Sequence, residues 1–225
     1  MRFHTIVATA FAFVATAASG EAIPRASLVP PERAAKAVAS VPLSNPGFES
    51  AAPGTVGAPA GWFVGQHAGP PSYTFTHDAD TPRTGKLSLR IDNVGPEPWG
   101  ALDQVIVATP WRGKTLRFSA WLRTRDAKGN AHGGGAGLAM QTRHGGYVVE
   151  QVRMRTDAVH GTTDWARYEV HLEVARNADQ IEVGVNLFGP GSVWVDEAAL
   201  DVVDPPSAAA AAPGAAKREL PQVRP

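Results

Sequence analysis

The sequence predicts an all-β domain, an antiparallel β-sandwich of the jelly-roll type, and three observations carry this prediction. Apolar and polar residues alternate with a period of two in several segments. Turn-forming residues, 23 Gly and 19 Pro among 225 residues, separate those segments. No long segment shows a helical pattern. Half-buried alternation is typical of antiparallel sheets, and the spacing of the segments predicts about eight to ten strands.

Each expected strand places alternate residues in the core. The strands and their inward residues are, in order, 86–91 with Leu87, Leu89 and Ile91; 115–123 with Leu116, Phe118, Ala120 and Leu122; 138–143 with Leu138 and Met140; 167–174 with Tyr168, Val170, Leu172 and Val174; and 181–187 with Ile181, Val183, Val185 and Leu187. The intervening residues are expected on the opposite side of each strand, away from the core.

The chain divides into four parts by composition. Residues 1–22 read as an export signal, with a positive start at Arg2, an apolar run and small residues near the cleavage point. An uncleaved anchor is the alternative, but the run is short for a membrane span. Residues 23–42 are rich in Pro and are expected to be a linker, 43–203 form the sandwich, and 204–225 are an Ala/Pro-rich tail expected to be disordered.

Charge and cysteine content exclude several classes. The 21 basic residues balance the 21 acidic residues, so no electrostatic field would attract nucleic acid. There is no cysteine and therefore no disulfide. With the export signal, this predicts a periplasmic or secreted protein that stays out of the membrane after cleavage and is expected to be a monomer.

Three motifs in order suggest a family. They are Asn45-Pro-Gly-Phe-Glu49 with Trp62 downstream, Thr84-Gly-Lys-Leu-Ser-Leu89, and Val193-Trp-Val-Asp-Glu197. With the segments between them, their order and spacing resemble the CenC-type carbohydrate-binding modules of the galactose-binding-like jelly-roll superfamily. The resemblance covers nearly all of residues 43–203 and implies the fold more specifically than it implies sugar binding.

The resemblance also implies a structural calcium ion near the first and last strands. Carried over to this sequence, its ligands would be Glu49, Asp196 and the carbonyl of Lys86. Calcium takes six to eight oxygen ligands, so backbone oxygens and water would have to complete this shell. The alternative is that Glu49 makes a turn hydrogen bond and Asp196 a surface pair.

The outward positions of the strands suggest a glycan site. Trp121, Arg123, Gln141, Arg143 and Asn186 all fall on the side of their strands that faces away from the core. A flat aromatic ring flanked by amide and guanidinium groups suits the apolar face and hydroxyl rim of a sugar. Trp62, Trp99 and Tyr147, in or beside loops, are predicted to rim the same groove. The alternative for Trp121 is that a second layer or the linker covers it.

Catalytic motifs are missing from the sequence. It has no Gly-x-Ser-x-Gly elbow and no His-Glu-x-x-His helix, and it has no cysteine nucleophile. Asp78, Asp80, Asp103 and Glu150 offer carboxylates, but any chain with 21 acidic residues supplies such candidates.

Three functions are compatible with these observations. The first is an exported, non-catalytic binding module for a polysaccharide or cell-surface glycan. The second is a scaffold domain of the same fold that binds an envelope protein through the outward Arg and Glu of 115–123 and 167–174. The third is a small secreted hydrolase, which the missing catalytic motifs do not favour.

Overall fold

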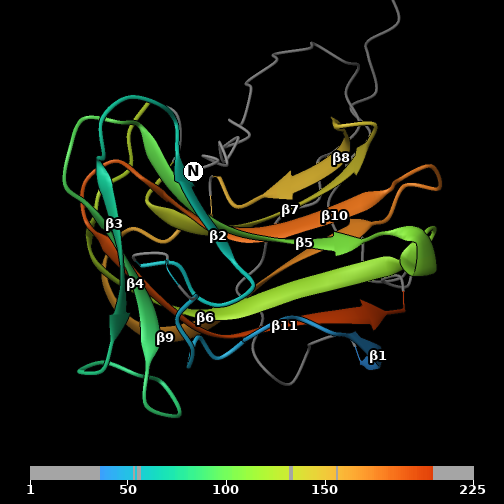
Figure 1. Cartoon of the computed structure of the whole chain (residues 1–225), viewed down its shortest axis with the longest axis horizontal. Helices are drawn as coiled ribbons and strands as arrows, with labels where there is room; N and C mark the ends of the chain where they lie inside the picture. Colours follow the sequence, from blue (N-terminus) through green and yellow to red (C-terminus); the bar gives the residue numbers. More distant parts are fainter. Residues whose placement is uncertain (1–35, 53, 55–56, 132–133, 156, 205–225) are drawn as a thin grey trace, which may run out of the picture.

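Strands from distant parts of the chain pair to form two antiparallel sheets that face each other (Figure 1). The computed structural model describes residues 36–204, except 53, 55–56, 132–133 and 156. Sheet I has the order β3-β4-β11-β6-β9, with β1 added beside β11, and sheet II has the order β2-β5-β10-β7-β8. The strands are β1 Ala37–Val41, β2 Phe63–Gln66, β3 Tyr73–Asp78, β4 Ser88–Asn93, β5 Trp99–Val107, β6 Thr115–Ala127, β7 Ala136–His144, β8 Tyr147–Arg153, β9 Gly161–Glu173, β10 Gln180–Phe188 and β11 Ser192–Val203.

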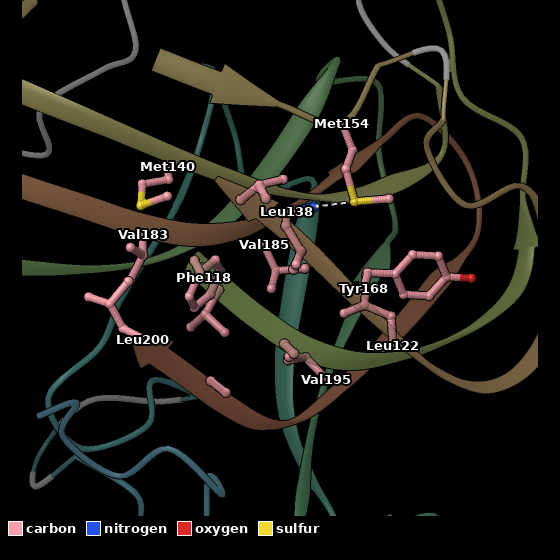
Figure 2. Packing of buried hydrophobic residues seen from close by; sticks show 14 of the residues in the cluster. Phe118, Leu122, Leu138, Met140, Met154, Tyr168, Val183, Val185, Val195 and Leu200 are labelled. Atoms are coloured by element: carbon pink, nitrogen blue, oxygen red, sulfur yellow. Dashed lines mark hydrogen bonds between the residues drawn. The ribbon is translucent and has the colours of Figure 1, made fainter. Parts of the chain in front are cut away.

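The core lies between the sheets and consists of the inward residues that the alternation predicts. Figure 2 shows Phe118 and Leu122 of β6 among Leu138 of β7, Val185 of β10 and Val195 of β11. All five are at most 1% exposed. The predicted jelly-roll sandwich is therefore confirmed, because apolar faces of two sheets can leave water only by packing on each other.

The N-terminal boundary of the domain differs from the prediction. Residues 37–41 were expected in the linker, but they form β1, which pairs with the end of β11 from Ala37↔Val203 to Val41↔Leu200. Four of its five residues are exposed, so β1 has no alternating apolar face that the sequence could reveal. The export signal, the rest of the linker and the tail from residue 205 onward lie outside the described residues.

Regular helix is nearly absent from the part of the chain that the structure describes. One 3-10 turn, Thr109–Trp111, links β5 to β6. In the same residues there is no helix of the length and apolarity that a membrane span needs.

Candidate functional site

The face of sheet II that points away from the core has small residues in the middle. Asp103 on β5 lies opposite Gly184 on β10, which lies opposite Ala139 on β7, which in turn lies opposite Arg153 on β8. The acidic and the basic side chain thus stand on either side of a glycine and an alanine. Adjacent strands are about 4.8 Å apart, so this row forms a floor of small, buried residues between two charged groups, with the Asp103 carboxyl lying over its Gly184 end.

The neighbouring rows supply further polar groups. On one side of this floor Glu182 of β10 lies opposite Gln141 of β7, and on the other side Asn186 of β10 lies opposite Gly137. We call the set Asp103, Gln141, Arg143, Arg153, Glu182 and Asn186 the polar face of sheet II. It contains carboxyl groups, carboxamides and guanidinium groups, so it offers both hydrogen-bond acceptors and donors.

Two side-chain contacts link residues of the polar face. Nε of Arg143 lies 3.3 Å from Oε2 of Glu182, and Nη2 of Arg153 donates to Oε1 of Gln141 at 3.5 Å. Gln141 is 3% exposed, and within the described residues its Nε2 has no hydrogen-bond partner. A buried donor without an acceptor costs about 1 to 3 kcal/mol, so this amide N–H is available to donate to an oxygen brought close to it.

Asp103, also on this face, has no direct partner among the described residues. It makes no hydrogen bond and no ion pair to another residue in the described part of the chain. Burial raises the pKa of its carboxyl well above the usual range, and the charge of Glu182 adds to that effect, while Arg153 and Arg143 oppose it.

An apolar strip borders the polar face. Phe63 on β2 lies directly opposite Asp103 and is 65% exposed. Val105 and Val107 continue the strip along β5 at 43% and 66% exposure. An exposed aromatic ring beside hydrogen-bonding groups is the arrangement in which a sugar ring stacks on one side chain and hydrogen-bonds to others.

The structure divides the residues that the sequence placed on one face. Gln141, Arg143 and Asn186 do lie together on sheet II, but Trp121 and Arg123 belong to β6 of sheet I. The prediction of one common face is wrong, because the core separates the outer surfaces of the two sheets (Figure 1). Strand alternation gives the side of the strand, but it does not give the sheet to which the strand belongs.

On sheet I, Trp121 and Arg123 contact residues of their own sheet or its loops. The guanidinium carbon of Arg83 lies 3.6 Å from the centre of the Trp121 ring, and Arg83 also pairs with Glu197. The guanidinium of Arg123 lies 5.8 Å from the ring centre of Trp194, whose Nε1 donates to Asp78. One side of the Trp121 ring is therefore already covered by a cation.

The three predicted rim residues have different environments. Trp62 is not at a rim: it is 4% exposed, packs on Phe48 with ring centres 5.1 Å apart, and donates from Nε1 to the carbonyl of Ser44. Trp99 begins β5 on the outer side of sheet II but is 4% exposed, with the His67 ring against it. Tyr147 begins β8 and is 81% exposed.

The predicted metal ligands lie close together but are held by hydrogen bonds. Oε1 of Glu49 accepts the N–H of Lys86 at 2.9 Å, and Oδ2 of Asp196 accepts the N–H groups of Arg83 and Thr84 at 3.0 and 3.1 Å. Burial raises the pKa of Asp196. Among the described residues, no three or more His, Asp or Glu side chains gather as a metal site. The donor set thus fits a clamp of carboxylates on backbone N–H groups better than it fits calcium, and calcium stays a prediction.

Phe63, Asp103, Arg153 and Glu182 were not among the predicted site residues. The alternation already placed Glu182 outward, and the same reasoning applied to Leu102, Gln104 and Ile106 would have placed Asp103 outward. Phe63 lies in a strand of four residues, which is too short to show a period.

No protein-family model matches the sequence. An uncharacterized HTH-type transcriptional regulator, YbfP, of Bacillus subtilis (strain 168) is 31% identical over 151 residues, which cover 64% of this chain and 48% of that protein. The chain therefore spans about half the length of the curated relative it matches.

Solved structures share the fold. The enzymatically active domain of tailspike protein 4 of bacteriophage CBA120 has a TM-score of 0.52 at 13% identity, covering 74% of this chain and 22% of that chain. A xylan-binding domain of carbohydrate-binding module family 22 has a TM-score of 0.49 at 18% identity, covering 74% of this chain and 96% of that domain. At these identities the likeness concerns the fold alone.

Proposed function

We propose that the chain is an exported, non-catalytic binding module for a polysaccharide or another glycan, and that the polar face of sheet II is its binding site. The observation that carries the proposal is the buried Nε2 of Gln141, which has no hydrogen-bond partner in the described part of the chain and lies at the edge of a floor of Gly184 and Ala139. Membership of the CenC type in particular rests on the sequence motifs, and export rests on residues 1–22.

The chemistry of this face matches a sugar. A hydroxyl group both donates and accepts hydrogen bonds, so it can accept from Gln141 and donate to a carboxylate such as Glu182. Phe63 gives an exposed ring beside these groups for the apolar side of the sugar. Because Arg143 and Glu182 already pair with each other, the ligand does not have to supply a counter-charge for either.

The scaffold alternative requires the outward Arg and Glu residues of sheet I to be available to a protein partner. These residues already have partners on the same sheet, with Arg117 Nη2 2.8 Å from Asp201 and Arg167 Nη1 3.2 Å from Glu169. Binding a protein through them would first break these pairs. The name of the Bacillus subtilis relative assigns it no ligand, so the glycan proposal depends on the geometry of sheet II.

Affinity gel electrophoresis tests the proposal. The purified full-length chain is run through gels that contain soluble xylan, β-1,4-galactan or β-glucan, next to Gln141→Ala and Trp121→Ala. We expect at least one polysaccharide to retard the wild type and Trp121→Ala, and Gln141→Ala to migrate freely.

The paired variants also show which surface binds. Trp121→Ala is the matched control because it removes a ring from the outer face of the opposite sheet. Retardation that Trp121→Ala loses and Gln141→Ala keeps would place the site on sheet I. No retardation of the wild type in any gel would contradict the function for these glycans, and crosslinking to an envelope protein would then favour the scaffold alternative.

A further inference from the structure

The side chain of Asp103 lies across the middle of the floor of sheet II. A Cβ atom at Gly184, the residue opposite on β10, would come within 2.0 Å of Oδ1 of Asp103. The carboxyl group therefore occupies the space that the missing side chain of residue 184 leaves. This position puts it between Phe63 of β2 and the charged residues of β7, β8 and β10.

Three charged groups face this carboxyl from the neighbouring strands. Glu182 comes from β10, Arg143 from β7 and Arg153 from β8, while β2 contributes the uncharged Phe63. Arg143 is engaged by Glu182, and Arg153 donates to Gln141. Arg143 thus pairs with Glu182 rather than with Asp103 in the described chain.

The surroundings therefore favour the neutral acid. Burial is the largest effect on the pKa of Asp103, and repulsion from Glu182 is the next, and both raise it. A neutral carboxyl group has an O–H that donates and a carbonyl that accepts, whereas an ionised one accepts only. A ligand lying over the floor would remove more water and favour the neutral form further.

We propose that glycan binding at this face is linked to a proton: Asp103 binds the sugar in its protonated form, donating its O–H to a sugar oxygen, and loss of that proton weakens binding. This inference rests on the proposed function and adds its regulation by pH. Glycan affinity is then highest in acid and falls as the pH rises through the titration of Asp103, by about tenfold per pH unit at the steepest.

The first test needs no glycan. Carboxyl carbon NMR of the full-length protein, with Asp103→Asn to assign the signal, gives the titration of Asp103. We expect it to titrate above the ordinary aspartate range. Glu182→Gln should move this titration to lower pH, because it removes the repelling charge and frees Arg143. Titration of Asp103 in the ordinary range overturns the inference.

The second test repeats the gels with xylan and β-1,4-galactan from about pH 5 to about pH 8, with wild type, Asp103→Asn and the control Glu150→Gln. Glu150 is an exposed carboxylate of β8 outside the polar face. We expect retardation of wild type and Glu150→Gln to weaken as the pH rises, and that of Asp103→Asn to stay constant. The carboxamide of Asn can still donate to a sugar oxygen, so this variant keeps the bond without the titration.

The outcomes separate the inference from the proposed function. Equal retardation of the wild type at every pH keeps the glycan function and overturns the proton linkage. Retardation that grows as the pH rises also overturns the linkage, because Asp103 would then bind as the ionised group. Absence of retardation of every variant at every pH overturns the glycan function for these polysaccharides, and the linkage with it.

Discussion

Asp103 on β5 and Gly184 on β10 face each other across the ladder of sheet II so closely that no side chain fits at position 184. A Cβ there would come 2.0 Å from Oδ1 of Asp103 and 2.4 Å from the carbonyl oxygen of Leu102. The side chain of Asp103 can rotate away, but the carbonyl belongs to the backbone of β5. The glycine is therefore required by the close approach of two strands and by the position of the carboxyl group.

This relationship predicts that Gly184→Ala destabilises the domain. The added methyl must push β5 from β10, and we expect a cost of about 1 to 3 kcal/mol in the free energy of unfolding. Urea denaturation, with the midpoint lowered at an unchanged slope, measures it. Gly65→Ala on β2 is the matched control, since a Cβ there meets no atom within 4 Å. Equal effects of the two substitutions would refute the steric explanation.

The pH dependence of stability should reveal the raised pKa of Asp103. Its pKa is raised in the folded protein, so between the unfolded and the folded value the folded state holds more protons, and stability falls as the pH rises through that window. Asp103→Asn removes this loss. As the pH rises through the window, we expect the free energy of unfolding of the variant to increase relative to that of the wild type by at most about 1.4 kcal/mol per pH unit. Urea unfolding at several pH values measures this difference. Parallel stability curves would contradict the raised pKa.

A pair of hydrogen bonds fastens the opening motif to sheet II. Oε1 of Gln104 accepts the N–H of Ser44 at 2.8 Å, and its Nε2 donates to the carbonyl of Ser44 at 3.0 Å. Gln104→Ala leaves both backbone groups without this partner, and we expect it to cost about 1 to 3 kcal/mol in urea unfolding. Gln151→Ala, an exposed glutamine on β8, should cost little. A Gln104→Ala midpoint equal to that of wild type would show that water replaces the amide.

The substitution Asp196→Ala tests the clamp that Asp196 forms between β11 and the loop before β4. Its two oxygens accept the N–H groups of Arg83, Thr84 and Glu197, so we expect Asp196→Ala to lose about 2 kcal/mol of stability whether EDTA or calcium is present. Thermal unfolding in both solutions measures this. A rise in the wild-type midpoint with calcium that Asp196→Ala abolishes would instead establish the metal site that the family resemblance implies.

Much of the fold follows from local patterns, and the site follows from them only in part. The alternation in 115–123 and 181–187 gave the right inward residues, because an antiparallel strand that is half buried must repeat its apolar residues with the pleat. β1 was missed because it is an edge strand with four exposed residues, so burial left no pattern in it. Gln141, Arg143 and Asn186 were grouped correctly, while Trp121 and Arg123 were assigned to the wrong surface.

The sequence by itself determined the period of each strand, the turns between strands, and therefore which side chains enter the core. The tertiary structure decided which strands are neighbours: β10 pairs with β5 and β7, whereas β6 pairs with β11 and β9. Those pairings join residues more than thirty positions apart, as with Asp103 and Gly184 or Trp121 and Asp196. A local pattern records whether a residue is buried, but the residues across the ladder are chosen by how both apolar faces close into one core.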